Sequence, residues 1–235
     1  MTTGVGELYA RLRSEIRPPL VLDVRRRPGR CGAESRARFR EAHVPGAVLV
    51  DLESELPRTK RSPLPDLDRL RKAARRWGLA EGRRVVLYDD HGNRTAARAW
   101  WLLRWAGARD VTLLDGALDA WRDGGLLPVA TGEPTAPEPG GDLALTPGQL
   151  PVLDAKEAAR VARTGVLLDS PAPVGAGLAR DGRFLPAGEL PGRYRDLGVR
   201  DGVEVGVRSN PGTAEAHTVA ALARAGVTAA LYPAM

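Results

Sequence analysis

Short apolar runs recur along the chain, and most of them lead into a polar loop. Runs of this kind, rich in Val and Leu, are typical of strands that are buried on both faces of a sheet. They predict strands at Pro19–Val24, after the Pro45-Gly46 turn, and at Arg84–Tyr88, Val111–Leu114, Val166–Asp169, Glu204–Arg208 and Ala229–Tyr232.

Longer segments between these runs repeat their apolar residues at the spacing of one helix face. The first of them, within Met1–Pro19, places Leu8, Leu12 and Ile16 on one face. Strands that alternate with such helices indicate a parallel sheet covered on both faces. Further helices are predicted at Ser35–Glu41, Leu67–Trp77 and Thr95–Ala106, from Ala117, and at Ala155–Ala162, Gly188–Leu197 and Glu215–Ala225.

The pattern of strand, loop and helix occurs twice. The run that ends in Asp89 matches the run that ends in Ser209, 120 positions later, and beyond the loop the offset falls to 119. A gap confined to a loop supports a duplication. We therefore expect two α/β domains of one fold at residues 1–129 and 149–235, joined by a Pro- and Gly-rich linker at 130–148. The second copy stops soon after its last strand, so we expect it to be shortened and one face of its sheet to be less covered.

The composition is that of an ordinary globular protein, with 43% hydrophobic and 27% charged residues among 235. No apolar run approaches the roughly 20 residues that a membrane span needs. The first helix lacks the apolar core of a secretion signal, so we expect a cytoplasmic protein without a membrane partner. The net charge of +6 comes almost wholly from Arg residues spread over both halves. Because no aromatic residues interleave with them, nucleic acid is not an expected partner.

Cys31 is the only cysteine, which excludes an internal disulfide bond and a cysteine-based zinc site. Its neighbours Arg25, Arg26, Arg27 and Arg30 would favour the thiolate. The cysteine lies in a loop of the first domain, however, so an incidental surface cysteine is the favoured interpretation. No metal and no cofactor are expected.

Several motifs follow one another in a characteristic order along both halves. In the first half they are His43–Val48, Tyr88-Asp89, Ala96–Arg104 and Leu114–Gly116, and in the second half Asp181–Pro186, Ala216–Val219 and Leu231–Pro233. In this order they resemble the tandem rhodanese-like sulfurtransferases, the thiosulfate and 3-mercaptopyruvate enzymes. The resemblance implies two rhodanese-like domains and a family reaction in which sulfane sulfur passes to a thiophilic acceptor through a cysteine persulfide.

The resemblance also implies that the two domains have different roles. The first domain is structural and has Asp89 where the second domain has the nucleophilic cysteine, at the head of a loop whose backbone N–H groups point inward. The matching position in the second half is Ser209. The loop that it heads, six residues long as in sulfurtransferases, continues with Asn210, Pro211, Gly212, Thr213 and Ala214.

A serine at this position changes the chemistry. Sulfur transfer requires a thiolate that attacks the sulfane sulfur, and loop N–H groups together with a helix N-terminus favour that thiolate. The Ser209 hydroxyl has neither the acidity nor the soft nucleophilicity for this step. Pro171 also stands where the resemblance expects a substrate-binding Arg, a second His-x-Pro-Gly-Ala motif is reduced within Ala172–Ala179, and the stretch that closes the site is absent after Pro233.

Three hypotheses remain open on the sequence. The leading one is a sulfurtransferase homologue whose persulfide chemistry is lost or impaired. The second is a module without catalysis in which the loop binds a small sulfur-containing anion or another oxyanion. The third is a hydrolase in which His217 or a carboxylate activates Ser209. The resemblance implies that His43 is a structural turn residue, and His91 in the first-domain loop is expected to face solvent.

Overall fold

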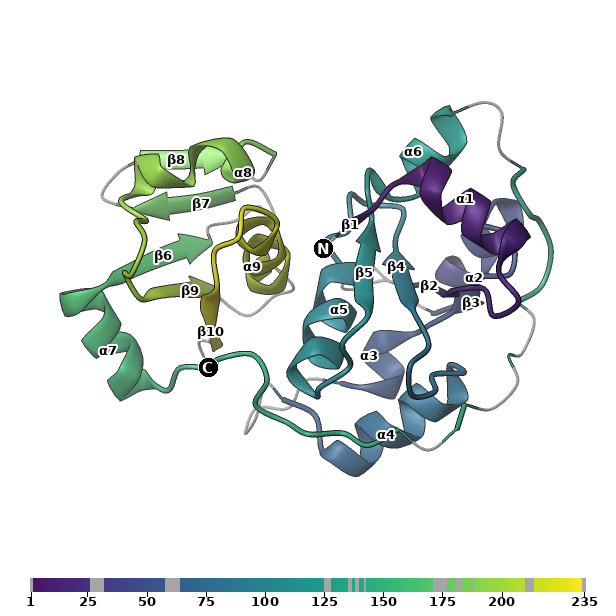
Figure 1. Cartoon of the computed structure of the whole chain (residues 1–235), viewed down its shortest axis with the longest axis horizontal. Coiled ribbons are helices and arrows are strands. Elements are labelled where there is room, and N and C mark those ends of the chain that lie inside the picture. Colours follow the sequence, from purple (N-terminus) through teal and green to yellow (C-terminus); the bar gives the residue numbers. More distant parts are fainter. Residues whose placement is uncertain are drawn as a thin grey trace. The chain divides into compact units, whose positions relative to one another are not determined.

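A computed structural model gives the fold of this protein (Figure 1). It describes residues 2–25, 32–57, 64–124, 128–134, 137, 140–141, 143–170, 177–180, 183–186, 188–209 and 214–233. Among these residues, no helix has the length and apolar character that a membrane crossing requires.

The chain divides into two compact units, Met1–Pro147 and Gly148–Met235. Most of the segment 130–148, which was predicted as a linker, falls within the first unit. The Gly140 N–H donates to the Arg75 carbonyl at 2.8 Å, and the Thr146 N–H donates to the Ala106 carbonyl at 2.8 Å. These bonds hold an irregular Pro- and Gly-rich segment against the first unit.

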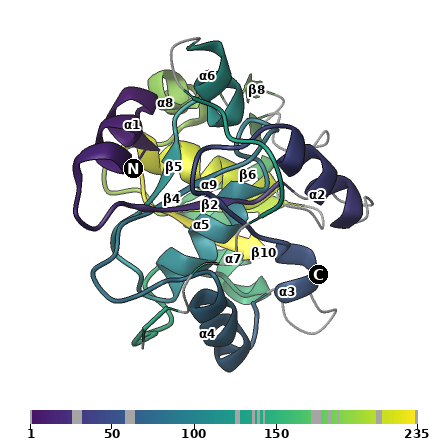
Figure 2. The same cartoon turned by 90° about the vertical axis from the view of Figure 1, so that its right-hand side faces the viewer.

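The first unit contains a five-stranded parallel sheet in the order β1-β5-β4-β2-β3. Helix α5 lies on one side of this sheet and helices α1 and α2 on the other (Figure 1). Helix α4 lies at the end of the unit away from α6 (Figure 2). The elements are β1 Thr2–Thr3, α1 Val5–Ser14, β2 Leu20–Asp23, α2 Gly32–Glu41, β3 Val48–Leu49, α3 Leu52–Glu55, α4 Leu67–Arg76, β4 Val85–Tyr88, α5 Ala96–Trp105, β5 Val111–Leu114 and α6 Ala117–Asp123.

Burial explains why these segments fold as they do. All residues of β2 and β4 are buried, as expected of central strands covered on both faces. Helix α5 is buried at nine of its ten positions, which explains its apolar sequence. The predicted first helix is shorter than expected, because α1 ends at Ser14 and leaves Ile16 fully exposed rather than on its apolar face. The core on the side of α1 and α2 consists of Leu8, Val21, Phe39, Val44, Ala47, Val86, Tyr88, Leu114, Leu118 and Trp121.

The second unit contains a five-stranded sheet in the order β10-β9-β6-β7-β8. Strands β10, β9 and β6 are parallel, whereas β7 and β8 are antiparallel. Helix α7 packs on β6 and β9, and α9 packs on β9 and β10. The elements are α7 Ala155–Thr164, β6 Val166–Ser170, β7 Gly177–Arg180, β8 Arg183–Pro186, α8 Leu190–Arg193, a 3₁₀ turn Tyr194–Leu197, β9 Val205–Ser209, α9 Ala214–Arg224 and β10 Ala229–Pro233.

The prediction of an α/β protein with parallel strands and covering helices is confirmed. The antiparallel pair β7 and β8 was not predicted, and it follows β6 where the first unit has a helix and a short parallel strand. The central strands nevertheless share one order, since β2, β4 and β5 are arranged in the first unit as β6, β9 and β10 are in the second. Strand β4 therefore corresponds to β9, and the ends of these two strands occupy corresponding places.

Candidate functional site

A cradle of backbone N–H groups surrounds the carboxylate of Asp89, directly after β4. One carboxylate oxygen accepts from the N–H groups of His91 and Asn93, both at 2.7 Å. The other accepts from Thr95 at 2.7 Å and Ala96 at 3.0 Å, at the start of α5. Asp89 is completely buried. Four backbone N–H groups of the loop therefore bind one carboxylate, which is that of Asp89 in the same chain.

Two left-handed residues allow this loop to turn back on itself. Gly92 and Asn93 have φ values of 65° and 64°, a conformation that Gly and Asn tolerate best. The Asn93 side chain donates to the Leu114 carbonyl at 2.6 Å, and the Leu118 N–H donates to the Asp89 carbonyl at 3.0 Å. Burial raises the pKa of the Asp89 carboxyl, and the backbone N–H groups oppose that rise. Neighbouring elements thus fix the loop around the carboxylate.

A second buried group lies beside the cradle, at the end of β2. The Arg25 guanidinium pairs with the Asp23 carboxylate, with one hydrogen bond of 2.7 Å, and both side chains are almost fully buried. The Tyr88 hydroxyl accepts from the Val44 N–H at 3.0 Å and hydrogen-bonds to Asp23. Burial raises the pKa of Tyr88 well above its ordinary value, and the Asp23 carboxylate adds to the rise.

His43, predicted to be structural, and His91, predicted to face solvent, have the expected surroundings. His43 is buried, its ring stacks on Phe39 with centroids 3.8 Å apart, and its Nδ1 is 2.8 Å from the Phe39 carbonyl oxygen. His91 is exposed, with Nε2 3.2 Å from an Arg94 nitrogen. Cys31 lies outside the described residues.

Ser209 is the last residue of β9, and α9 begins at Ala214. Its register partners are Ser170 at the end of β6 and Pro233 at the end of β10. The predicted loop residues Asn210, Pro211, Gly212 and Thr213 lie outside the described residues. His217 is half-buried on α9. Strand β9 therefore ends at the same edge of its sheet as β4 does in the first unit.

The ion pair at the end of β6 differs from its counterpart in the first unit. Asp169 corresponds to Asp23, but its partner is Arg208 from the neighbouring strand, at 2.7 Å. Both side chains are about half exposed, at 49% and 48%, whereas Asp23 and its arginine are buried. Arg208 occupies the register position that Tyr88 occupies in the first unit. Pro171, in place of the expected Arg, lies outside the described residues.

Ser170 was not singled out in the sequence. It is 7% exposed, and its hydroxyl has no hydrogen-bond partner in the part of the chain that the structure describes. The corresponding residue of the first unit is Val24, which is completely buried. An alignment of the two copies could have identified Ser170, because it pairs this hydroxyl with the apolar side chain of Val24.

The described residues contain no group of three or more His, Cys, Asp or Glu side chains suited to hold a metal ion. Chemically, the described edge of the second sheet offers a serine at a strand end, a half-exposed guanidinium and a buried hydroxyl. The Ser170 hydroxyl can donate a hydrogen bond to a small anion, whereas the Arg208 guanidinium is paired with Asp169 on the opposite face of the sheet.

Comparisons with known proteins bear on this geometry. The family model of the rhodanese-like domain matches residues 5–123. SseB of Mycobacterium tuberculosis, which is named for thiosulfate sulfurtransferase activity, is 36% identical over 247 residues, covering 92% of this chain and 86% of that protein. A Pseudomonas aeruginosa protein named for 3-mercaptopyruvate sulfurtransferase activity is 50% identical over 95 residues, covering 37% of this chain and 34% of that protein.

The fold is similar to that of a solved two-domain structure. SseA from Escherichia coli, a 3-mercaptopyruvate sulfurtransferase with the rhodanese fold, superposes with a TM-score of 0.74 at 24% identity. The match covers 98% of this chain and 97% of that one. The predicted fold class is therefore confirmed at the level of the whole chain.

Proposed function

This chain belongs to the rhodanese-like domain family, and we propose that it is a tandem-domain sulfurtransferase homologue whose persulfide chemistry is lost at Ser209. The observation that carries the proposal is the position of Ser209 at the end of β9, which corresponds to the end of β4 and its Asp89 cradle. In the family reaction a cysteine thiolate attacks the sulfane sulfur, the donor leaves with the bonding electron pair, and an acceptor then removes the sulfur. A serine hydroxyl is too weak an acid and too hard a nucleophile for the first step.

Sulfurtransferase assays of the full chain test this proposal. Thiocyanate formation from cyanide is measured with thiosulfate and with 3-mercaptopyruvate as donors. We expect no turnover above the buffer rate for the natural chain, and the same result for the matched control Cys31→Ser. In Ser209→Cys we expect a persulfide on the new thiol after incubation with donor, detected as the added mass of one sulfur atom. Turnover of the natural chain at the rate of an active family member would refute the proposal.

A second candidate function is the binding of a small oxyanion without catalysis. The Asp89 cradle favours it, because that loop directs four backbone N–H groups at one carboxylate. At the corresponding place the second unit has the neutral Ser209, so a cradle of the same kind would have room for an anion from solution. Small sulfur oxyanions such as thiosulfate and sulfate are the proposed ligands.

Titration calorimetry separates this candidate from the first. We expect sodium thiosulfate and sodium sulfate to bind to the natural chain. Ser209→Asp should abolish binding, because its carboxylate would fill the cradle as Asp89 does in the first unit. Ser14→Asp, at the exposed end of α1, is the matched control for the added charge. If no heat is detected with the natural chain, the binding function is excluded, whatever the sulfurtransferase assay shows.

A further inference from the structure

The first unit has a cavity at the edge of its sheet opposite to the Asp89 cradle. Its volume is about 460 Å³, and it is lined by residues 15–18, 80–84 and 110. These three segments precede β2, β4 and β5. The Leu20 N–H donates to the Arg84 carbonyl at 2.8 Å, and the strand starts are joined further because the Val85 N–H donates to the Asp110 carbonyl at 2.8 Å. A cavity of this volume is in the size range of small-molecule sites.

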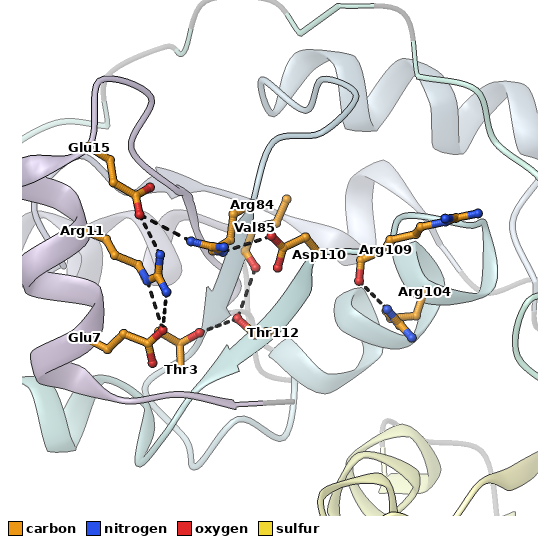
Figure 3. Close-up of polar contacts among 10 residues, drawn as sticks. All are labelled: Thr3, Glu7, Arg11, Glu15, Arg84, Val85, Arg104, Arg109, Asp110 and Thr112. Carbon is orange, nitrogen blue, oxygen red and sulfur yellow. Dashed lines mark hydrogen bonds and ion pairs between the residues drawn. The ribbon is translucent and has the colours of Figure 1, made fainter.

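One arginine of the cavity is already paired within the chain. Arg84 Nε donates to Asp110 at 3.0 Å, and a terminal nitrogen of Arg84 lies 3.5 Å from Glu15 (Figure 3). Glu15 also pairs with Arg11 at 2.7 Å. The carboxylates of Glu15 and Asp110 are therefore occupied by arginines and do not neutralise the other basic residues of the cavity.

Two further arginines of the cavity, Arg17 and Arg83, have no acidic partner among the described residues. Arg17 is exposed, and the half-buried Arg83 donates to the Gly78 carbonyl at 3.0 Å. Burial lowers the pKa of Arg83, and the nearby charge of Arg17 lowers it further. Because these like charges repel each other, an anion in the cavity would be attracted to both.

The second unit shows that the turn before the central strand does not need an arginine. In the first unit the Arg83 N–H closes this turn at 3.1 Å, and Gly82 within it has a φ of 70°. In the second unit the Val203 N–H closes the corresponding turn at 3.2 Å, and Gly202 has a φ of 77°. Valine thus occupies the place of Arg83 in a turn of the same form. The turn therefore does not explain the charged side chain, whereas a bound anion would.

The cavity also presents an apolar surface. Ile16 lines it and is fully exposed, and Pro18 and Ala80 are half-buried. A single exposed apolar residue is common on protein surfaces. Ile16, however, lines the same cavity as two arginines without acidic partners. This combination suits a ligand that has a negative charge at one end and an apolar body.

We propose that this cavity binds a small organic carboxylate, whose charged group pairs with the guanidinium groups of Arg17 and Arg83 and whose apolar body covers Ile16. A planar carboxylate matches the geometry of a guanidinium group. Glu81 also lines the cavity, and it has no basic partner in the part of the chain that the structure describes. Its charge disfavours ligands with several negative charges, so we propose a monocarboxylate. The site lies away from Ser209 and does not depend on the proposed function.

An NMR titration of the full chain with sodium benzoate tests this proposal. We expect the amide signals of Gly82 and Arg83 to shift, with a dissociation constant on the order of 1 mM for a ligand of this size. Benzamide and sodium phosphate are the control ligands. Both should bind at least about fivefold more weakly, because benzamide lacks the charge and phosphate lacks the apolar body.

Substitutions of the charged residues test the assigned contacts. Arg83→Gln should weaken benzoate binding roughly tenfold, and Arg17→Gln about threefold because this side chain is exposed. Arg122→Gln, at the exposed end of α6, removes the same charge outside the cavity and should leave the affinity unchanged. Glu81→Gln removes a repelling charge and should bind benzoate at least as tightly as the natural chain.

Each of these measurements has an outcome that would overturn the proposal. The Gly82 and Arg83 signals would remain unshifted at benzoate concentrations well above the expected dissociation constant, or benzamide or phosphate would bind as tightly as benzoate. Equal affinities of Arg17→Gln and Arg122→Gln would also overturn it. Because Arg17 is exposed, this comparison decides the matter even if Arg83→Gln does not fold.

Discussion

Replacing Asp89 with asparagine tests the anion cradle of the first unit with a change of little volume. The asparagine oxygen can still accept from two of the four N–H groups. The amide nitrogen, which replaces the other carboxylate oxygen, directs its own donors at the remaining two, for example those of Thr95 and Ala96. Asp89→Asn therefore leaves two buried backbone N–H groups without an acceptor.

The size of the effect follows from these contacts. Each buried donor that loses its partner costs roughly 1–3 kcal/mol, so the two together cost about 2–6 kcal/mol. With a urea dependence of roughly 1–3 kcal/mol/M for small proteins, a loss of about 4 kcal/mol lowers the unfolding midpoint by about 2 M. Such a loss is a large share of the ~5–15 kcal/mol stability of a typical domain.

Tryptophan fluorescence provides an assay that reports on the first unit alone. All five tryptophans, at positions 77, 100, 101, 105 and 121, belong to that unit. Asp123→Asn, at the exposed end of α6, is the matched control, and we expect it to change the unfolding free energy by less than about 0.5 kcal/mol. A loss below about 1 kcal/mol for Asp89→Asn would refute the reasoning, because the amides would then have found other acceptors.

Three further substitutions have defined expectations. Arg25→Met leaves the buried Asp23 carboxylate without its cation and should destabilise the first unit by about 3–5 kcal/mol in the same urea assay; no change would mean that Asp23 folds protonated without cost. Asp154→Ala removes the capping box of α7 and should cost about 1 kcal/mol, measured by amide exchange in that helix; unaltered exchange would contradict this role. The hydrogen bond from Arg160 lowers the pKa of Glu204, so Arg160→Gln should raise that pKa toward its ordinary value. An NMR titration of the Glu204 carboxyl carbon measures the change. An unchanged midpoint would show that the pair does not form in solution. Because the pKa is lowered, the pair contributes stability above the unfolded-state pKa and loses it as the pH falls.

The sequence predicts the parts of the fold that depend on local pattern. Fully buried strands such as Val85–Tyr88 have a continuous apolar run, and α5 has an apolar sequence on nearly every side. The duplication then relates Asp89 to Ser209, because both follow the same strand pattern. The strands and α5 were predicted because their signal lies within a few residues of the chain, and the correspondence of Asp89 and Ser209 followed from comparing two such local patterns.

Features that depend on register or on distant partners could not be predicted in this way. Arg208 pairs with Asp169 across 39 positions, and this pairing becomes visible only when β6 and β9 are aligned in the sheet. The Ser170 hydroxyl has no hydrogen-bond partner among the described residues, and this can be recognised only once its surroundings are known. The strands β7 and β8 contain charged residues and glycine without clear alternation, so the apolar pattern gave no sign of them.

The Asp89 carboxylate also determines how the stability of the first unit responds to dissolved anions. A group held in the correct orientation within its own binding loop has a very high effective concentration, which a dissolved anion at millimolar levels cannot match. The first unit should therefore be indifferent to the sulfate or thiosulfate content of its buffer. If the second unit binds these anions, its stability will rise with their concentration by mass action. The two units would then act as an internal reference and a sensor within a single chain.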